Sequence, residues 1–430
     1  MKAGLREIRK NLAWRLRLYR AGRARARSGA VFIGVTGSSG KSTAAGLLGH
    51  ILAGQSAVHT QILANAMTAL VNTLYKRVPR AGPLDYVVFE AGAFGVGTIR
   101  PMAEMLKPHV AVVTMVRLEH LSSFRTLENV AQEKRALVEA LEPGGLAVLN
   151  ADDPNVLAMA SGQHRFVTFG ESEAADYRVT DISAAYPRRL SFTLLWRAAA
   201  LDLQTSFPGA HFWLPVAAAA ATALELGVLP QTVADRVATF EPLANRCQVI
   251  TTDGGPHFIV DCAKAPGHSV GLAFEMLASS TFDSKRIVLG QLSDFTGSNI
   301  RYARAYESAR EIAGQVIYVG EHAHRSKASQ DDRDIGRFVE LRTPKEVSDH
   351  IKRTAAPGEL VLLKSSSNLH LERIALAWSR DVKCWIPACG KKEGCLTCGL
   401  YEVPFDEHRD FVRKRKFHRR LQRLRRAFGG

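Results

Sequence analysis

One short turn in this sequence has the composition of a phosphate-binding site. Residues 36–43 read "TGSSGKST" and lie between the apolar runs "VFIGV" and "AAGLLGHIL". Glycines let backbone N–H groups face an anion, a lysine reaches phosphate oxygens, and a following hydroxyl can bind Mg²⁺. The strict form of this motif has glycine where Val35 stands. A turn kept for packing alone needs no lysine, so the stretch predicts a nucleotide site. The residues expected to line it are Thr36, Gly37, Ser38, Ser39, Gly40, Lys41, Ser42 and Thr43.

Two further polar side chains are expected at the same edge of a sheet. Glu90 ends the strand-like run "YVVFE", and His120 follows "VAVVTMVRLE". The C-terminal ends of parallel strands meet at one edge, where ligands bind. A carboxylate and an imidazole there are suited to a Mg²⁺ shell. The alternatives are a carboxylate that caps a helix for Glu90 and a structural role for His120.

Four of the six cysteines fall within "CWIPACGKKEGCLTCG". They are Cys384, Cys389, Cys395 and Cys398, and the stretch ends in a CxxC pair flanked by glycine. Four thiolates this close in sequence can bind zinc tetrahedrally. We expect a zinc site; unconnected thiols are the alternative, and a disulfide is disfavoured in a reducing compartment.

Strands and helices alternate along most of the chain. Between Ala30 and Gly170, the apolar runs "AVFIGVTG", "DYVVFEAG", "HVAVVTMV" and "GLAVLNADD" are separated by helical patterns from Lys41, around Pro101–Leu106, and over Leu127–Leu141. This alternation predicts a parallel sheet covered on both faces. Residues 171–208 predict short antiparallel strands, and an alanine-rich helix is expected over Pro215–Leu226.

A second α/β series follows residue 228, with the strand-like runs "HFIVD", "RIVLG", "QVIYVG" and "ELVLLK" and a last helix over Leu369–Ser379. The predicted fold class is α/β, with a parallel-sheet P-loop ATP-binding domain followed by a smaller Rossmann-like domain. The expected segments are a basic amphipathic stretch (1–28), the ATP-binding domain (29–228), the second domain (229–380), and a cysteine knuckle with a basic tail (381–430).

The net positive charge comes from the two ends of the chain. Residues 1–28 hold ten lysines or arginines against one glutamate, residues 405–430 hold ten against three acids, and these +9 and +7 make up the formal net charge of +16. Helical spacing in the first segment aligns Leu5, Ile8, Leu12, Leu16 and Tyr19, as in helices that lie at a membrane surface. We expect peripheral membrane contact; solvated ends are the alternative. Nucleic acid is disfavoured because no recognition motif is present.

The composition is that of a globular protein, with 46% hydrophobic and 23% charged residues. Arginines interrupt the apolar stretch near the start, unlike a secretory signal, and no run has the length of a membrane span. We therefore expect a cytoplasmic protein, located in part at the inner membrane surface.

Nine fragments, in order over residues 30–380, resemble the Mur ligase family of ATP-dependent enzymes that join a carboxylate to an amine. They are "VTGSSGKST", "VVFEAG", "VVTMVRLEHLSSFRTLENVAQEKRALVEAL", "AVLNADDP", "PGAHFWLPVAAAA", "PLANRCQVI", "VDCAKAPGHS", "IVLGQLSD" and "ELVLLKSSSNLHLERI". Within the family, the sequence is most similar to the branch that adds D-alanyl-D-alanine to a muramoyl tripeptide. Only 28 residues precede the first strand, so we expect the family's N-terminal UDP-sugar domain to be absent.

The resemblance implies a role for each matching residue. Lys41 would hold phosphates and Ser42 a Mg²⁺, while Glu90 and His120 bind metal. Lys134 matches the lysine that the family carbamylates to support a second Mg²⁺. Arg246 and Asp261 would meet the nucleotide from the second domain. The expected substrate-binding residues are Lys264 and, in the loop near the incoming amine, Lys364, Ser365 and Ser366.

Three stretches depart from the family pattern. The two asparagines that help hold adenine are absent from His211-Phe212-Trp213-Leu214-Pro215. Lys264 stands where the family often has histidine, and the substrate-loop asparagines are reduced to Asn65-Ala66-Met67. The two missing asparagines leave the preference for adenine open.

The resemblance implies an ATP- and Mg²⁺-dependent ligase that forms an amide bond through an acyl phosphate, in cell-wall or envelope polymer metabolism. Its partners would be a small amine and a carboxylate acceptor that is lipid-linked or polymeric. The alternative is a catalytically inactive, nucleotide-binding scaffold, suggested by the lost asparagines.

Overall fold

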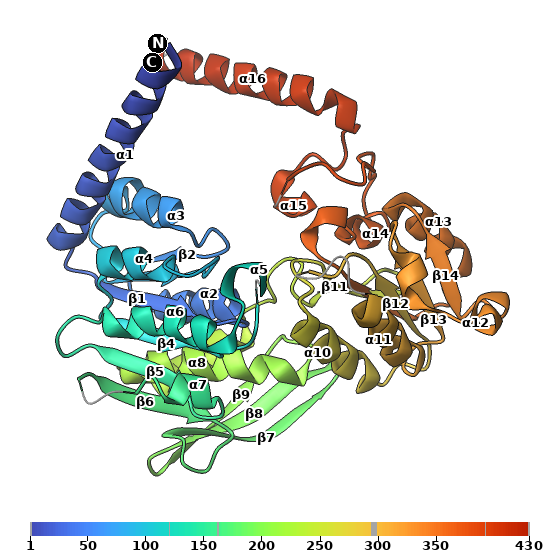
Figure 1. Ribbon diagram of the computed structural model, residues 1–430, viewed down its shortest axis with the longest axis horizontal. Helices are drawn as coiled ribbons and strands as arrows, with labels where there is room; N and C mark the ends of the chain where they lie inside the picture. Colours follow the sequence, from blue (N-terminus) through green and yellow to red (C-terminus); the bar gives the residue numbers. More distant parts are fainter. Residues whose placement is uncertain (1, 120, 161–162, 294–298, 392, 429–430) are drawn as a thin grey trace. The chain divides into compact units, whose positions relative to one another are not determined.

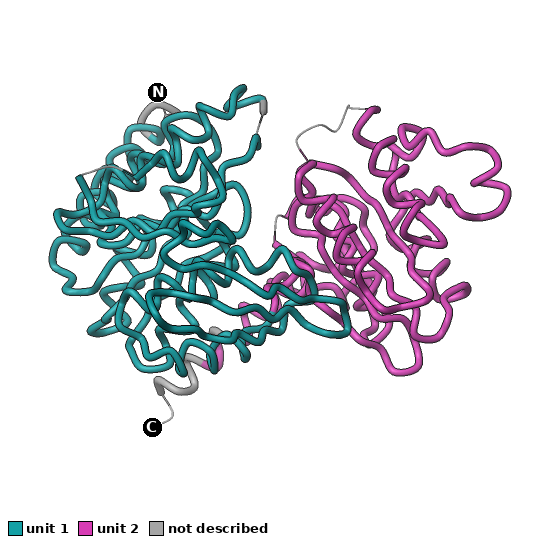
Figure 2. The backbone as a smooth tube through the Cα atoms, turned by 90° about the horizontal axis from the view of Figure 1, so that it is seen from below, with its two compact units in different colours: residues 1–241 teal, residues 242–430 magenta. Residues whose placement is uncertain are grey.

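The computed structural model describes residues 2–119, 121–160, 163–293, 299–391 and 393–428. The chain forms two compact units, residues 1–241 and 242–430, coloured teal and magenta in Figure 2. Helix α9 (Pro230–Ala238) contacts α2, α8 and β9, and therefore belongs to unit 1. The second domain was predicted to begin at residue 229, whereas the boundary between the two units lies after residue 241. Among the described residues, no helix is long and apolar enough to cross a membrane.

Unit 1 is built on one sheet with the strand order β2-β3-β1-β4-β5-β6-β7-β8-β9 (Figure 1). Pairs from β2 to β7 are parallel, and β8 is antiparallel to both β7 and β9. The expected antiparallel strands of residues 171–208 thus extend the main sheet. The bounds are β1 Val31–Thr36, β2 Val58–Gln61, β3 Tyr86–Glu90, β4 Val110–Val113, β5 Leu146–Asn150, β6 Arg165–Gly170, β7 Tyr177–Ala185, β8 Arg188–Trp196 and β9 Ala199–Gln204.

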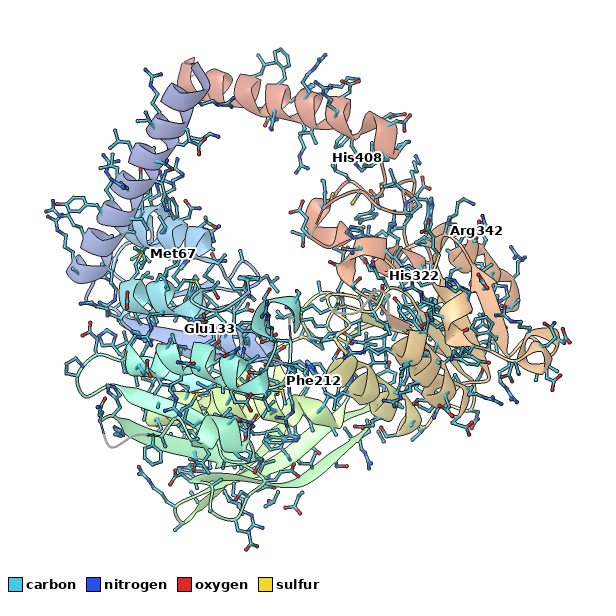
Figure 3. The ribbon with its side chains drawn as sticks, in the orientation of Figure 1. Met67, Glu133, Phe212, His322, Arg342 and His408 are labelled. Carbon is cyan, nitrogen blue, oxygen red and sulfur yellow. The ribbon has the colours of Figure 1, made fainter. Side chains whose placement is uncertain are left out.

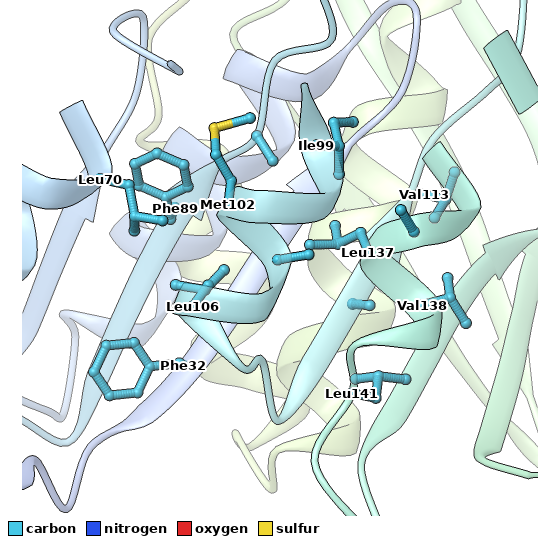
Figure 4. Close-up of a cluster of buried hydrophobic side chains, with 14 of the residues drawn as sticks. Phe32, Leu70, Phe89, Ile99, Met102, Leu106, Val113, Leu137, Val138 and Leu141 are labelled. Carbon is cyan, nitrogen blue, oxygen red and sulfur yellow. The ribbon is translucent and has the colours of Figure 1, made fainter. Parts of the chain in front are cut away.

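Helices cover both faces of this sheet, as β-branched strands buried on both faces require. Phe32 and Phe89 pack with Met102 and Leu137 in one core (Figure 4), while alternate strand residues such as Ile33 are buried outside that cluster. The helices are α1 Lys2–Arg27, α2 Lys41–Leu52, α3 Met67–Asn72, α4 Ile99–Leu106, α5 Leu121–Phe124, α6 Leu127–Glu139, α7 Pro154–Leu157 and α8 Trp213–Glu225, with short turns Thr73–Arg77, Val78–Arg80 and Ala210–Phe212.

Helix α1 packs against unit 1 along one face. Trp14 and Leu18 contact the core that also buries Ala21. One turn further on, the buried Arg25 donates from Nε to the Leu106 carbonyl (2.6 Å), and its guanidinium lies 4.1 Å from the Phe32 ring centroid. The arginine thereby satisfies a carbonyl at the end of α4 while its stem covers apolar surface. Trp14, Leu18 and Ala21 of α1 therefore serve docking rather than solvent contact.

Unit 2 has the sheet order β10-β11-β15-β12-β13-β14, in which only β10 is antiparallel to its neighbour. This confirms the second α/β sheet. The strands are β10 Gln248–Ile250, β11 His257–Asp261, β12 Lys285–Leu289, β13 Gln315–Val319, β14 Phe338–Leu341 and β15 Leu360–Lys364. The helices are α10 Gly267–Ala278, α11 Asn299–Arg310, α12 Gln330–Asp334, α13 Pro344–Thr354, α14 Glu372–Leu376, α15 Cys395–Cys398 and α16 His408–Phe428, with short turns Ala323–Ser326, Ser367–Leu369 and Phe405–Glu407.

The helix expected over Leu369–Ser379 is shorter than the sequence pattern suggested. His370 has a left-handed backbone with φ of 51°, and α14 begins only at Glu372. A non-glycine residue in this region is uncommon and ends a helical turn. The break turns the chain after β15 so that His370 and Glu372 become buried together.

Candidate nucleotide and metal site

The phosphate loop joins β1 to α2 as the sequence predicted. Gly37 has φ of 144°, and a Cβ built there would lie 2.0 Å from the Thr114 hydroxyl, so no side chain fits. Gly40 has φ of 79° immediately before α2 begins at Lys41. The first N–H groups of a helix have no intrahelical acceptor and carry the positive end of its dipole. The loop therefore presents N–H groups that can bind phosphate.

The segment after β4 holds the loop in place. Ser38 donates its backbone N–H to the Met115 carbonyl (2.8 Å), and its hydroxyl is hydrogen-bonded to both the carbonyl and the N–H of Arg117. Thr114 donates its hydroxyl to the Ser39 carbonyl (2.6 Å). The loop is thus pre-organised by contacts within unit 1, which reduces the ordering cost of binding a ligand.

Lys41 is 8% exposed, and its Nζ donates to the carbonyl of Gly37, at the other end of the same loop. Ser42 and Thr43, the next two residues of α2, are also buried. The lysine thus lies over the loop that can bind phosphate. A cation at this place is suited to the oxygens of a bound triphosphate.

Glu90 lies beside the loop, at the end of β3. Its neighbour across the sheet is Val35 of β1, and it is 2% exposed. Its two carboxylate oxygens accept from the Leu63 N–H (2.8 Å) and the Asn65 amide (2.9 Å). These partners orient the carboxylate, and neither lies at the start of a helix, so the helix-cap alternative has no support in these contacts.

Lys134 is fully buried in α6 and forms an ion pair with Glu119, with Nζ 2.6 Å from Oε1. Glu119 is 6% exposed. Glu119 was not among the predicted site residues, although Glu119 directly precedes His120 and follows the same apolar strand. His120 itself lies outside the described residues. A buried ion pair close to the C-terminal edge of the sheet is therefore the main addition that the structure makes to the site.

The residue next to Lys134 has a different task. Glu133, labelled in Figure 3, accepts from the Gly97 N–H (2.6 Å), the Thr98 hydroxyl (3.1 Å) and the Ile99 N–H. These groups lie at the start of α4, where a carboxylate satisfies otherwise unpaired donors. Glu133 thus stabilises the start of α4. Its neighbour in α6, Lys134, pairs with Glu119.

The segment that lacks the family's asparagines begins α8. Phe212, labelled in Figure 3, is buried and stacks on Phe207 with ring centroids 4.4 Å apart. Pro215 lies next to Gly40: a Cβ atom built on Gly40 would be 3.4 Å from the Cβ of Pro215, an ordinary contact distance. Packing against the core explains Phe212, and packing against the loop explains Pro215. Neither residue offers the amide group that an asparagine would present to a base.

In unit 2, the expected residues Asp261 and Lys364 pair with each other. The Lys364 ammonium is 1% exposed and also donates to the Lys264 carbonyl (3.1 Å) and the Ser269 hydroxyl (3.2 Å). An ammonium has three donors, and all three are engaged here. Lys364 therefore positions Asp261 and the segment that follows Asp261, and the substrate contact expected for Lys364 stays a prediction.

The neighbouring serines differ from each other. Ser365 is buried, and its hydroxyl accepts from the Gln291 N–H (3.1 Å). Within the described part of unit 2, the Ser366 hydroxyl and the Arg246 Nε are buried without a hydrogen-bond partner. Buried polar groups are normally paired, so these two are the better candidates for ligand contact. Lys264 is exposed.

The four clustered cysteines also come together. Cys384, Cys389, Cys395 and Cys398 line one pocket of unit 2, together with His370 and Arg373. The other two cysteines, Cys247 and Cys262, are buried elsewhere in the unit. The sequence spacing therefore predicted a real spatial cluster, and His370 was the member that it did not reveal.

The fold and the loop define a P-loop nucleotide-binding protein with two α/β units. Residues 35–223 match the Mur ligase middle domain. The UDP-N-acetylmuramoyl-tripeptide–D-alanyl-D-alanine ligase of Mycobacterium tuberculosis (strain CDC 1551 / Oshkosh) is 32% identical over 388 residues, which cover 83% of this chain and 74% of that relative. The ligase of the same name from Bacillus subtilis (strain 168) is 25% identical over 351 residues, covering 80% and 74%. The chain belongs to the Mur ligase family.

Solved structures of the family share the fold. MurF from Acinetobacter baumannii has a TM-score of 0.73 at 22% identity, covering 83% of this chain and 78% of its own. MurF ligase from Thermotoga maritima, in complex with ADP, has a TM-score of 0.71 at 20% identity, covering 83% and 81%. The sequence relatives identify an ATP-dependent carbon–nitrogen ligase that forms amide bonds, and the solved structures show the shared fold.

Proposed function

We propose that this ligase joins the amine of an amino acid or short peptide to the carboxylate of a cell-wall or envelope precursor. A carboxylate oxygen attacks the γ-phosphorus of ATP, and ADP leaves. The amine nitrogen then attacks the carbonyl carbon of the acyl phosphate and forms the C–N bond. The bond between that carbon and the phosphate oxygen breaks, inorganic phosphate leaves with the electron pair, and the amine proton passes to solvent. The named relatives use D-alanyl-D-alanine as the amine and a muramoyl tripeptide as the acid, so dipeptides and muramoyl peptides are the first substrates to test.

One observation carries the proposal: a pre-organised phosphate loop lies beside buried acidic and basic side chains at one sheet edge. In this proposal, Lys41 and the loop N–H groups bind the β- and γ-phosphates. The Ser42 hydroxyl and the Glu90 carboxylate are hard oxygen donors, which fit Mg²⁺. The metal would supply charge neutralisation at the transferred phosphoryl group. The buried Lys134–Glu119 ion pair would set the electrostatic potential next to these groups.

The test is phosphate release by the purified full chain with ATP, Mg²⁺, a panel of amines and a panel of acids. We expect release only when both an acid and an amine are present, with a product whose mass equals their sum minus water. Phosphate release that is equal with or without the two substrates would contradict the proposal. Nucleotide binding without release under any combination would instead support the scaffold alternative.

We further propose that α1 holds the enzyme at an anionic membrane surface, close to a lipid-linked acceptor. Ile8, Leu12, Leu16 and Tyr19 are 63%, 68%, 46% and 61% exposed on the side of the helix away from the core. Exposed basic residues flank this stripe, and they are Arg6, Arg9, Lys10, Arg15, Arg17, Arg20, Arg23 and Arg27. An apolar stripe between cations complements the acyl boundary and headgroups of an anionic bilayer.

Vesicle co-sedimentation measures this contact. The chain should bind vesicles that contain phosphatidylglycerol and should not bind pure phosphatidylcholine. The variant Leu12→Glu/Leu16→Glu should bind more than about tenfold more weakly, since burying each leucine contributes over 1 kcal/mol. Ile335→Glu is the matched control, because Ile335 is equally exposed (66%) in unit 2. Equal binding by the α1 variant and the control would exclude the proposed surface.

A further inference from the structure

The cysteine pocket of unit 2 has features that the ligase reaction does not use. Of its four thiols, Cys384 and Cys395 are buried and the other two are partly exposed. The pocket lies at the break after β15, because His370 lines it, and Glu372 accepts from the Cys395 N–H (2.9 Å). The cluster therefore joins two segments that are distant in sequence: residues 370–373 and the stretch 384–398.

Basic or imidazole nitrogens face three of the four sulfurs. The Lys391 Nζ is 2.9 Å from the Cys398 sulfur, and the His370 Nε2 is 3.2 Å from the Cys389 sulfur. The Arg373 Nη1 is 4.0 Å from the sulfur of Cys384. A neutral thiol is a weak acceptor, whereas a thiolate accepts charge-assisted hydrogen bonds. A metal ion that held these sulfurs as thiolates would therefore have donors already beside them.

The donor set itself fits a metal ion. Four sulfurs line one pocket, which is the ligand number of a tetrahedral site. A buried thiol keeps its proton on its own, whereas a coordinated metal ion removes it. Sulfur donors in tetrahedral number select zinc.

We propose that Cys384, Cys389, Cys395 and Cys398 bind one Zn²⁺ through four thiolates. In this site, Lys391 and Arg373 donate to the sulfurs, His370 lies beside the Cys389 sulfur, and none of the three binds the metal. One nitrogen of His370, a Glu372 oxygen and the Cys395 sulfur lie within 4.8 Å of one another, which makes these two residues the competing ligands. Glu372 Oε1 accepts from the Cys395 N–H and faces His370 Nδ1 (3.1 Å), whereas Glu372 Oε2 is buried without a hydrogen-bond partner among the described residues. His370 has its partners in Glu372 and Cys389, as residues around a metal commonly do, and Glu372 is therefore the stronger competing ligand.

The metal would fix the loop that follows Lys364. Arg373 is 1% exposed and donates to the carbonyls of Cys384 (2.6 Å), Ile386 (2.9 Å) and Leu369 (3.0 Å). Arg373 therefore connects the cysteine stretch to the end of the loop that follows Lys364. Because structural zinc sites contribute to folding directly, removal of the metal should loosen both segments together.

Metal analysis of the purified full chain tests the proposal. Elemental analysis should give about one zinc per chain, and Cys398→Ser should retain less than about a fifth of it. Cys247→Ser is the matched control, because Cys247 is a buried cysteine of the same unit that does not line the pocket. We expect the control to keep its zinc. His370→Ala should also keep it, and loss of the metal in His370→Ala would overturn the four-thiolate assignment.

A second measurement does not depend on variants that fold. Chelation of the wild-type chain should expose four additional thiols to a colorimetric reagent, and Co²⁺ refilling should give the absorption of a tetrahedral thiolate complex. Hydrogen exchange in residues 364–376 should rise on chelation and fall on refilling with Zn²⁺. A metal-free folded chain with four free thiols, or with a disulfide in this stretch, would overturn the proposal. Neither outcome affects the proposed ligase reaction, which is assayed separately.

Discussion

Lys41→Ala is expected to reduce ATP-dependent phosphate release by at least about a thousandfold. The Lys41 ammonium lies over the phosphate loop, and the carbonyl of Gly37 is its hydrogen-bond partner. A cation that contacts the transferred phosphoryl group stabilises charge that develops in the transition state, and the loss of comparable groups costs factors of this size. Steady-state phosphate release with a cognate acid and amine measures the effect.

The fold should survive this substitution. Alanine is the best helix former, and the loop keeps its contacts to Thr114, Met115 and Arg117. The thermal midpoint should therefore change little. Lys76→Ala is the matched control, since Lys76 is an exposed lysine of the same unit, and its activity should equal that of the wild type. A Lys41→Ala enzyme with near-normal turnover would remove this lysine from the mechanism.

Much of the fold could be predicted because local patterns and packing agree. Apolar β-branched runs alternate with helical periods, and glycine at position 37 matches a backbone that admits no side chain. The pattern did not reveal that β7, β8 and β9 extend the main sheet, because strand pairing depends on distant partners. It also extended the last helix of unit 2 too far, since the left-handed backbone of His370 has no signal in composition.

The candidate site was predictable where chemistry follows a short motif. The phosphate loop, Glu90 and the cysteine cluster are each marked by spacing or by position at a strand end. Glu119 and His370 were missed because each acts through a partner distant in sequence, namely Lys134 and Cys389. The three internal acceptors of the buried Lys364 ammonium are likewise not indicated by the residues next to it in the sequence. A lone charged residue in a sequence does not show where its partner lies.

The Lys134–Glu119 pair predicts a large effect on both stability and activity. In Lys134→Met, a carboxylate that is 6% exposed loses the ammonium 2.6 Å from it. Removing one partner of a buried ion pair costs about 3 kcal/mol or more. The free energy of unfolding of unit 1, measured by denaturant titration, should fall by about that amount, and turnover at saturating substrates should fall at least about a hundredfold.

A double substitution separates the two effects. Replacing both charges by apolar residues of similar size often restores stability, so Glu119→Leu/Lys134→Met should be within about 1 kcal/mol of the wild type yet remain inactive. The matched control is Arg286→Met, which breaks the buried Arg286–Glu359 pair (3.0 Å) of unit 2. It should destabilise unit 2 and leave turnover per folded molecule unchanged. If the double variant recovers turnover as well as stability, the pair serves only packing. If it recovers stability alone, the charges of Lys134 and Glu119 act in the reaction.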